Sequence, residues 1–202
     1  LDSGPGFGGS CFKKDILNLV YLARHFGLGE VADFWEGVIH LNIWHQHRIS
    51  KLVVDKLFGT LSDKKIAILG FSFKANTNDT RESAAIQICI DLLDEGAEIL
   101  IHDPKVDPVQ IEKELGRKQK ASHNKKELKN SWYSIEDIYE GFVEVDATII
   151  LTEWEEYSKI DWNKAAMLMR RPAWVFDARS IIDYEKISKT NLNFWRIGDG
   201  TL

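Results

Sequence analysis

The sequence predicts an α/β protein in which long central helices are followed by a Rossmann-like, mostly parallel sheet. Two observations carry this prediction. Between residues 12 and 58, apolar residues recur at helical spacing. From residue 64 onward, short runs rich in Ile, Val and Phe alternate with helical stretches, which is typical of β-α-β units. We therefore expect two parts, residues 1–58 and residues 59–202.

The first part begins with a loop. Residues 1–11 contain four glycines and cannot hold regular structure. A helix is expected over residues 12–26, because one of its sides gathers Ile16, Leu17, Leu19, Val20 and Leu22. Gly27 and Gly29 are expected to end it.

A second helix is expected from residue 30 to residue 58. It would be ~40 Å long at 1.5 Å per residue, which is more than a small domain needs. Its aromatic residues Phe34, Trp35 and Trp44 indicate a face that a neighbouring domain or a second subunit covers. We therefore expect a homodimer or a higher homo-oligomer.

The second part reads as an open sheet with covering helices. Its first β-α-β unit comprises a strand at 64–73, a helix at 83–96 and a strand at 97–103. Further strands are expected at 145–152, 173–178 and 193–198, and further helices around 108–115, 135–141, 161–169 and 181–188. The lysine-rich segment 116–131 is interpreted as a solvated loop.

Composition limits the expected partners. The 202 residues carry 26 Lys and Arg against 31 Asp and Glu, a net charge of -5 without a basic stripe, so we expect no nucleic-acid partner. Because no apolar run approaches the ~18 residues of a membrane span, we expect no membrane partner and a soluble, cytoplasmic protein. The chain opens at Leu1 directly into a glycine loop, which suggests a fragment of a longer protein.

The two cysteines have different surroundings. They are too few for a disulfide framework and lack the clustered spacing of a zinc site, so we expect no metal. Cys89 lies in an Ile-rich helix and is expected in the core. Cys11 follows the glycine loop at the start of a helix, where the helix dipole, Lys13 and Lys14 favour a nucleophilic thiolate. A small buried thiol is the alternative.

The loop ahead of Cys11 is a candidate ligand loop. The stretch from Gly4 to Gly9 satisfies G-x-G-x-x-G, but no strand precedes it and Pro5 has no N–H to donate, so we reject a dinucleotide fingerprint. Glycines do allow bare backbone to approach a ligand. Asp15, within one turn of Cys11, either steers a water or complements the helix dipole.

A second candidate site lies between the first strand and first helix of the sheet domain. Lys74 and Arg81 in the segment 70–83 could bind anionic oxygens at the edge where open α/β sheets bind ligands. The alternative is a polar loop whose Thr80 or Ser83 caps the helix. Asp103 ends the second strand like the ribose-binding acid of NAD domains, but we do not assign it that role because the glycine fingerprint is absent.

The end of a later strand carries a third group. Asp177, Ala178 and Arg179 follow the predicted strand at 173–178 on the same sheet edge. Arg179 is either another anion contact or half of a solvent-facing charge pair with Asp177.

Three segments carry a family resemblance. GFGGSCFKKDILNLVYL, KKIAILGFSFKANTNDTRES and FDAR occur in this order and resemble the C-terminal half of the UDP-glucose/GDP-mannose dehydrogenase family, particularly its animal-type branch. The resemblance spans essentially the whole chain. It implies an NAD-dependent enzyme that oxidises UDP-glucose to UDP-glucuronate by two hydride transfers, through a cysteine thiohemiacetal and thioester. Ala178 replaces the family's glycine.

The resemblance also implies residue roles. Cys11 falls on the nucleophile and Asp15 on the carboxylate that assists the water chemistry. Substrate contacts fall on Gly6, Phe7, Gly8, Gly9, Phe12, Phe73, Lys74 and Arg179. Arg81 falls on an arginine that reaches NAD. Residues 12–58 correspond to the dimer-forming helices and residues 59–202 to the UDP-binding domain, whereas the family's N-terminal NAD domain has no counterpart here.

Two alternatives remain open. A sister dehydrogenase acting on GDP-mannose or UDP-N-acetylmannosamine would share these motifs. A stand-alone nucleotide-sugar-binding or dimerisation module would use the same residues without catalysis.

Overall fold

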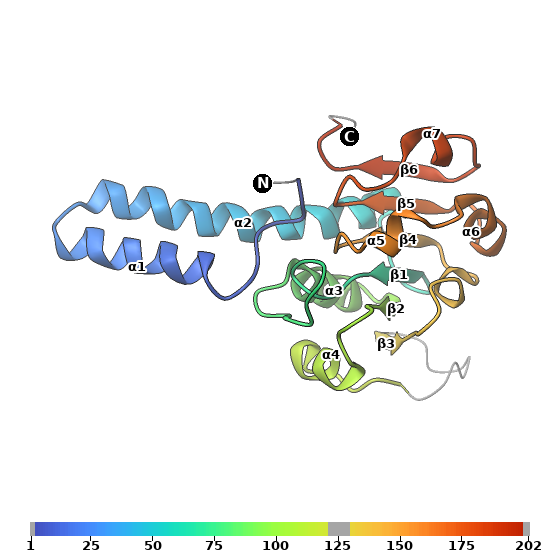
Figure 1. Ribbon diagram of the computed structural model, residues 1–202, viewed down its shortest axis with the longest axis horizontal. Helices are drawn as coiled ribbons and strands as arrows, with labels where there is room; N and C mark the ends of the chain where they lie inside the picture. Colours follow the sequence, from blue (N-terminus) through green and yellow to red (C-terminus); the bar gives the residue numbers. More distant parts are fainter. Residues whose placement is uncertain (1–2, 121–129, 200–202) are drawn as a thin grey trace.

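The computed structural model describes residues 3–120 and 130–199. Helices α1 (Phe12–His25) and α2 (Gly29–Lys56) form a hairpin that projects from an α/β domain (Figure 1). Small and branched residues pack between the two helices, with Ile16, Val20, Ala23, Ala32 and Ile39 buried. Gly27 ends α1 in a left-handed conformation, φ +73°. We expected Gly29 to help end the first helix, but it is the first residue of α2.

Within the described residues the sheet has six strands, all parallel. In chain order they are β1 (Lys65–Leu69), β2 (Glu98–His102), β3 (Ser131–Ser134), β4 (Ala147–Ile150), β5 (Trp174–Asp177) and β6 (Asn193–Arg196). The spatial order is β3-β2-β1-β4-β5-β6, so the chain reverses direction across the sheet between β1 and β4. This order is that of a Rossmann-like fold and confirms the predicted fold class.

Helices cover both faces of the sheet. On one face lie α3 (Ala84–Asp94), α4 (Pro108–Leu115) and the C-terminal half of α2. On the other lie the short helices α5 (Glu155–Ser158), α6 (Trp162–Leu168) and α7 (Tyr184–Ile187), with a 3₁₀ turn, η1 (Glu140–Phe142). The strands alternate their side chains between these faces, so Ile66 and Ile68 join one core cluster while Ala67 and Leu69 join the other.

Short polar side chains fix where four of the helices begin. Ser83 accepts a hydrogen bond from the Ala85 N–H and so caps α3, which is one of the two residues that the alternative interpretation of segment 70–83 offered as the cap. Asp107, Asp161 and Asp183 cap α4, α6 and α7 in the same way. Cys89 is fully buried on α3, as predicted.

The structure corrects the expectation for segment 116–131. Ser131 is buried and opens β3, and the Trp132 indole donates to the Arg117 carbonyl oxygen at 2.7 Å. β3 was not predicted because the polar sequence of the segment continues directly into this strand, which has only four residues. Residues 121–129 of the predicted loop lie outside the described residues.

The helix predicted over residues 135–141 is also wrong. The Asp137 carboxylate accepts from the Tyr139 N–H at 2.9 Å and closes a turn. A Cβ on Gly141 would lie 2.5 Å from the Ile135 side chain. The hydrogen-bonded turn at Asp137 therefore replaces the α-helix that the apolar spacing predicted, and the only helical structure in this segment is η1.

The first predicted strand of the sheet domain is shorter than expected. β1 stops at Leu69 because Gly70 has φ +95°, and a Cβ there would lie 2.3 Å from Thr152 Cβ. Residues 70–73 thus leave the sheet and begin the loop that was singled out in the sequence.

Within residues 3–120 and 130–199, no helix is both long and apolar enough to cross a membrane.

Candidate functional site

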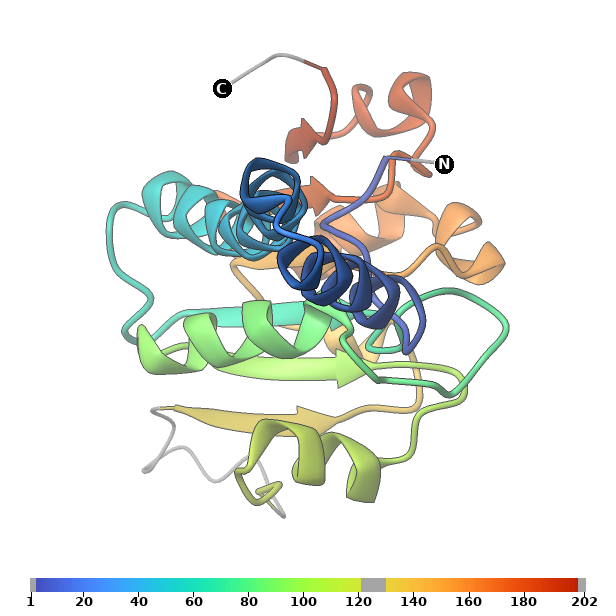
Figure 2. The same ribbon diagram turned by 90° about the vertical axis from the view of Figure 1, so that its left-hand side faces the viewer.

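The site lies where the carboxyl ends of β1, β4 and β5 meet the start of the helical hairpin. The loop after β1 and the residues after β4 flank the point at which the strand order reverses, which is where open α/β sheets bind ligands. The N-terminal loop reaches this edge from α1 (Figures 1 and 2). Three segments far apart in the sequence therefore meet here: residues 4–11, 70–83 and 177–179.

Glycines let the N-terminal loop pack on the loop after β1. The Gly9 N–H donates to the Arg81 carbonyl oxygen at 2.8 Å. A Cβ on Gly8 would lie 2.4 Å from the Glu82 carbonyl oxygen, and a Cβ on Gly9 would lie 3.0 Å from the Phe73 ring. Any larger residue at Gly8 would thus push the two loops apart.

The other side of the glycine loop rests on α2. Asn42 hydrogen-bonds both backbone groups of Phe7, and a ring nitrogen of His45 lies 3.1 Å from the Gly4 carbonyl oxygen. Gln46 is buried beneath Gly6. These three residues were not predicted from the sequence, although polar side chains at i, i+3 and i+4 on one side of a mainly apolar helix are a recognisable signal.

Cys11 is the N-cap residue of α1 and is exposed, which excludes the small buried thiol. Its sulfur lies 3.7 Å from the Ser10 hydroxyl. Asp15 follows in the first turn, with its N–H bonded to the Cys11 carbonyl oxygen at 2.8 Å. The Lys13 ammonium pairs with Glu82 at 2.7 Å, so it joins α1 to the loop after β1.

Three aromatic side chains lie in or beside the glycine loop. The rings of Phe7 and Phe12 meet edge to face with centroids 4.6 Å apart, and Phe12 is exposed. Phe73 is half-buried under Gly8 and Gly9, and the ammonium of the exposed Lys74 lies 5.3 Å from the Phe73 ring centroid.

Asp103 braces the loop after β1 from inside. One carboxylate oxygen accepts from the N–H groups of Phe71 at 2.7 Å and Ser72 at 3.0 Å, and from the Ser72 hydroxyl at 3.1 Å. The Trp154 indole donates to the same oxygen at 3.3 Å. The Asp103 carboxylate thus fixes the backbone of the loop after β1 at Phe71 and Ser72.

The exposed side chain of Arg81 is paired with Asp79 of the same loop. Its Nε and Nη2 donate to both carboxylate oxygens of Asp79, and this hydrogen bonding lowers the pKa of Asp79 and raises the pKa of Arg81. Cys11 adds a smaller electrostatic contribution that also raises the pKa of Arg81. The backbone of Arg81 also accepts from Gly9, two residues before Cys11, so the two residues lie on loops that are in contact.

Arg179 ties the strand ends together. Its Nε donates to the Leu151 carbonyl oxygen at 2.7 Å and lies 3.2 Å from Glu153 Oε2, and its Nη2 donates to the Phe73 carbonyl oxygen at 3.1 Å. Glu153 Oε1 in turn accepts from the Ala75 N–H at 3.2 Å. The guanidinium thus connects the loops that follow β5, β4 and β1.

Asp177 is not half of a solvent-facing pair, so that interpretation was wrong. It is fully buried and accepts from the N–H groups of Arg179 at 3.0 Å and Ile182 at 2.8 Å. Burial raises the pKa of Asp177. Ala178 is buried with a backbone that an L-residue adopts freely, so the structure accommodates alanine here.

A buried pair lies behind the site. A ring nitrogen of His102, Nδ1, is 2.9 Å from the Tyr157 hydroxyl, which also donates to the His102 carbonyl oxygen at 3.0 Å. Burial lowers the pKa of His102 and raises that of Tyr157.

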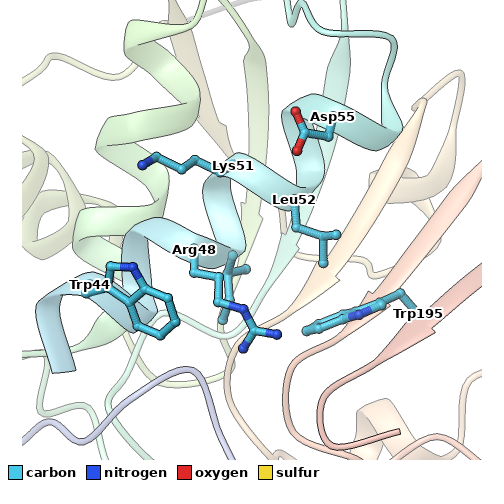
Figure 3. Close-up of a pocket in the computed structure, with 7 residues that line it drawn as sticks. Trp44, Arg48, Lys51, Leu52, Asp55 and Trp195 are labelled. Carbon is cyan, nitrogen blue, oxygen red and sulfur yellow. The ribbon is translucent and has the colours of Figure 1, made fainter. Parts of the chain in front are cut away.

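A hollow of about 290 Å³ opens on another side of α2. Figure 3 shows the Arg48 side chain extending between the indoles of Trp44 and Trp195. None of the predicted site residues lines this hollow. Phe34, Leu41 and Trp44 are exposed on the same helix, whereas Trp35 is half-buried in the hairpin, contrary to our expectation.

Comparisons with known proteins show which family the chain resembles. Residues 67–184 match the UDP binding domain of the UDP-glucose/GDP-mannose dehydrogenase family, and residues 1–44 match its central domain. UDP-glucose 6-dehydrogenase of Drosophila melanogaster is 42% identical over 198 residues, covering 98% of this chain and 41% of that protein. UDP-glucose 6-dehydrogenase 4 of Arabidopsis thaliana is 39% identical over 209 residues, covering 98% of this chain and 43% of the relative.

Solved structures agree as well. A UDP-glucose dehydrogenase from Pyrobaculum islandicum superimposes with a TM-score of 0.70 at 27% identity, covering 95% of this chain and 38% of that one. The present chain therefore spans about two fifths of the length of the proteins it matches.

Proposed function

Because the chain belongs to the UDP-glucose/GDP-mannose dehydrogenase family, we propose that it is the C-terminal part of an NAD-dependent UDP-glucose 6-dehydrogenase, which makes UDP-glucuronate. One observation carries the proposal. The glycine loop that presents the exposed Cys11 is packed against Phe73 and the Arg81–Glu82 backbone of the UDP binding domain. A sugar attached to a bound UDP would thus lie beside the thiol.

The chain's own residues supply binding and covalent chemistry. Lys74 and Arg179 attract the anionic and sugar oxygens of the substrate, while Phe73 and the backbone from Gly6 to Gly9 form the surface around it. The Cys11 thiolate adds to the C6 aldehyde that the first oxidation produces, giving a thiohemiacetal. Loss of hydride from that adduct gives a thioester, and water assisted by Asp15 releases the carboxylate and returns the thiol.

NAD, when bound, takes up the hydride at each oxidation. Among the described residues we assign one, Arg81, to it. The turn after β1 is no dinucleotide cradle, because the space beside Gly70 is filled by Thr152. We therefore assign the dinucleotide cradle to the remaining length that the relatives have.

We also propose that the complete enzyme is a homodimer or a higher homo-oligomer. Phe34 is 67% exposed and Trp44 is 55% exposed on α2, and Leu41 lies between them. A row of large apolar side chains of this kind marks an interaction surface. In this scheme residues 1–58 provide the dimer helices and residues 59–202 the UDP-binding domain.

The test uses the complete enzyme, meaning this chain joined to the remaining length of its relatives. We expect NADH formation with UDP-glucose and two NADH for each UDP-glucuronate. Faster turnover of GDP-mannose or UDP-N-acetylmannosamine would assign the chain to a sister dehydrogenase. The 202-residue chain alone is expected to bind UDP-glucose weakly and to reduce no NAD. Binding without turnover by the complete enzyme would instead favour a non-catalytic module.

A further inference from the structure

Asn42 holds one residue of the glycine loop by both of its backbone groups. Its Oδ1 accepts from the Phe7 N–H at 2.9 Å, and its Nδ2 donates to the Phe7 carbonyl oxygen at 3.1 Å. A neighbouring β-strand satisfies a residue in the same two-bond manner. Here a single amide side chain does so, from a helix 35 residues away in sequence.

The rest of the loop is fitted to the same face of α2. His45 contacts the Gly4 carbonyl oxygen, and a Cβ on Gly6 would lie 2.7 Å from Asn42 Oδ1. Gly6 has φ +132°, a conformation that glycine adopts without strain. The path of the loop is therefore shaped around Asn42.

We propose that Asn42 is a positioning residue, which fixes the Phe7 backbone so that the loop from Gly6 to Gly9 lies against Phe73 in the form that receives the nucleotide sugar. The proposal rests on the proposed function of this site. Without Asn42, a partly buried N–H and carbonyl would lose their partners, and the loop would move to regain hydrogen bonds from water.

Cys11 is held by a different set of contacts. It begins α1, which is anchored by the buried Ile16 and Val20. Loss of Asn42 should therefore loosen the substrate-binding part of the loop and leave the thiol in place. General destabilisation of the protein would affect both the loop and the thiol, so a change in the loop alone distinguishes the proposed role of Asn42.

The first experiment needs no substrate. Amide hydrogen exchange is measured by NMR in the 202-residue chain and in its Asn42→Ala variant, with His40→Ala as the control because His40 is exposed on the same helix. We expect the Phe7 amide to exchange about tenfold faster in Asn42→Ala only. The Ile68 amide in β1 should keep its rate. An unchanged Phe7 rate would overturn the proposal.

The Asn42→Asp variant covers the case in which alanine unfolds the chain. An ionised carboxylate can accept from the Phe7 N–H but has no proton for the Phe7 carbonyl, whereas a protonated carboxyl offers both. The Phe7 exchange rate relative to wild type should therefore fall as the pH is lowered from about 6 to about 3.5, through the pKa of an aspartate. A ratio that is independent of pH would contradict the clamp.

The last experiment uses the complete enzyme. Asn42→Ala should raise KM for UDP-glucose at least about fivefold, with kcat and the alkylation rate of Cys11 by iodoacetamide within about threefold of wild type. A fall in kcat at unchanged KM would overturn the positioning role. If the wild-type enzyme oxidised no nucleotide sugar, the proposed function would fail, while the exchange experiments would still decide whether Asn42 holds the loop.

Discussion

The Arg179 guanidinium donates from Nη2 to the carbonyl oxygen of Phe73 at 3.1 Å, across a separation of 106 residues. The same side chain donates to Leu151 and pairs with Glu153. Arg179 therefore sets the height of Phe73 and Lys74 above the sheet as well as lending positive charge to the site.

Arg179→Lys should weaken substrate binding. A lysine keeps the charge but lacks the planar fork that reaches three acceptors on two loops. Losing two hydrogen bonds of roughly 1 kcal/mol each should let Phe73 and Lys74 leave the conformation that binds substrate. We therefore expect KM for UDP-glucose to rise about tenfold or more in the complete enzyme, because a smaller fraction of it is competent to bind. Steady-state kinetics measures this. Arg171→Lys, at an exposed arginine, is the control and should leave KM unchanged.

Cys11→Ser should stop the formation of UDP-glucuronate while UDP-glucose still binds. A serine hydroxyl is a weak nucleophile at neutral pH and lacks the thiolate that the helix N-terminus favours. Chromatography of the reaction mixture measures the acid, and calorimetry measures binding. Ser10→Ala, beside the thiol, should keep turnover within a few-fold. Near-normal acid production by Cys11→Ser would end the case for a covalent intermediate.

Lys74→Ala should raise KM for UDP-glucose about 10- to 100-fold, because a charge-assisted hydrogen bond contributes roughly 1.5–3 kcal/mol. Thermal stability should hardly change, since the Lys74 side chain is exposed. Lys159→Ala removes an exposed ammonium that pairs with Glu155 and is the control. Equal KM values for the two variants would remove Lys74 from the substrate site.

His102 should make folding stability depend on pH. Its pKa is lowered by burial, whereas an imidazole in the unfolded chain ionises near about 6.5. Below that pH the unfolded state binds a proton that the folded state does not, so the free energy of unfolding falls as the pH is lowered. Urea denaturation from about pH 7.5 to about pH 5.5 should show a smaller loss for His102→Gln than for wild type. An equal fall in the free energy of unfolding for both proteins would contradict the role of His102.

Phe34→Asp should dissociate the proposed oligomer. A carboxylate placed among Leu41 and Trp44 would be desolvated on association, which is costly. Light scattering should give a monomer mass for Phe34→Asp and an oligomer mass for wild type. Val109→Asp makes the same change at an exposed valine of α4, 80% accessible, and should leave the mass unchanged. A wild-type monomer at high micromolar concentration would refute the oligomer.

Elements with local boundary signals could be predicted from the sequence. α4 occupies Pro108–Leu115, as expected, because Asp107 caps it and Gly116 ends it in a left-handed conformation. β3 carried no such signal. Four residues alternate too briefly to show a period, and Ser131 and Trp132 are buried by neighbours that lie far away in sequence.

The candidate site divides in the same way. The glycines and Cys11 were recognisable because their chemistry is tied to residue type. The roles of Asn42 and Asp103 were not, since an amide in a helix and an acid after a strand have many ordinary uses. Asn42 was not singled out, and Asp103 was considered only as a ribose-binding acid. Their importance comes from hydrogen bonds that span 35 and 32 residues. Pairing at that range is a property of the fold and has no local spacing.

α2 runs unbroken from the hairpin into the sheet domain, and its C-terminal half packs on α3 through Ile49 and Val53. An uninterrupted helix anchored at both ends offers no hinge. Hydrogen bonds also join the loop bearing Cys11 to the loop after β1, and that loop to Arg179 after β5, so we expect these segments to move together. If the site receives a nucleotide sugar, as we propose, the rate of substrate entry and product release should depend on movement between these segments and the rest of the complete enzyme.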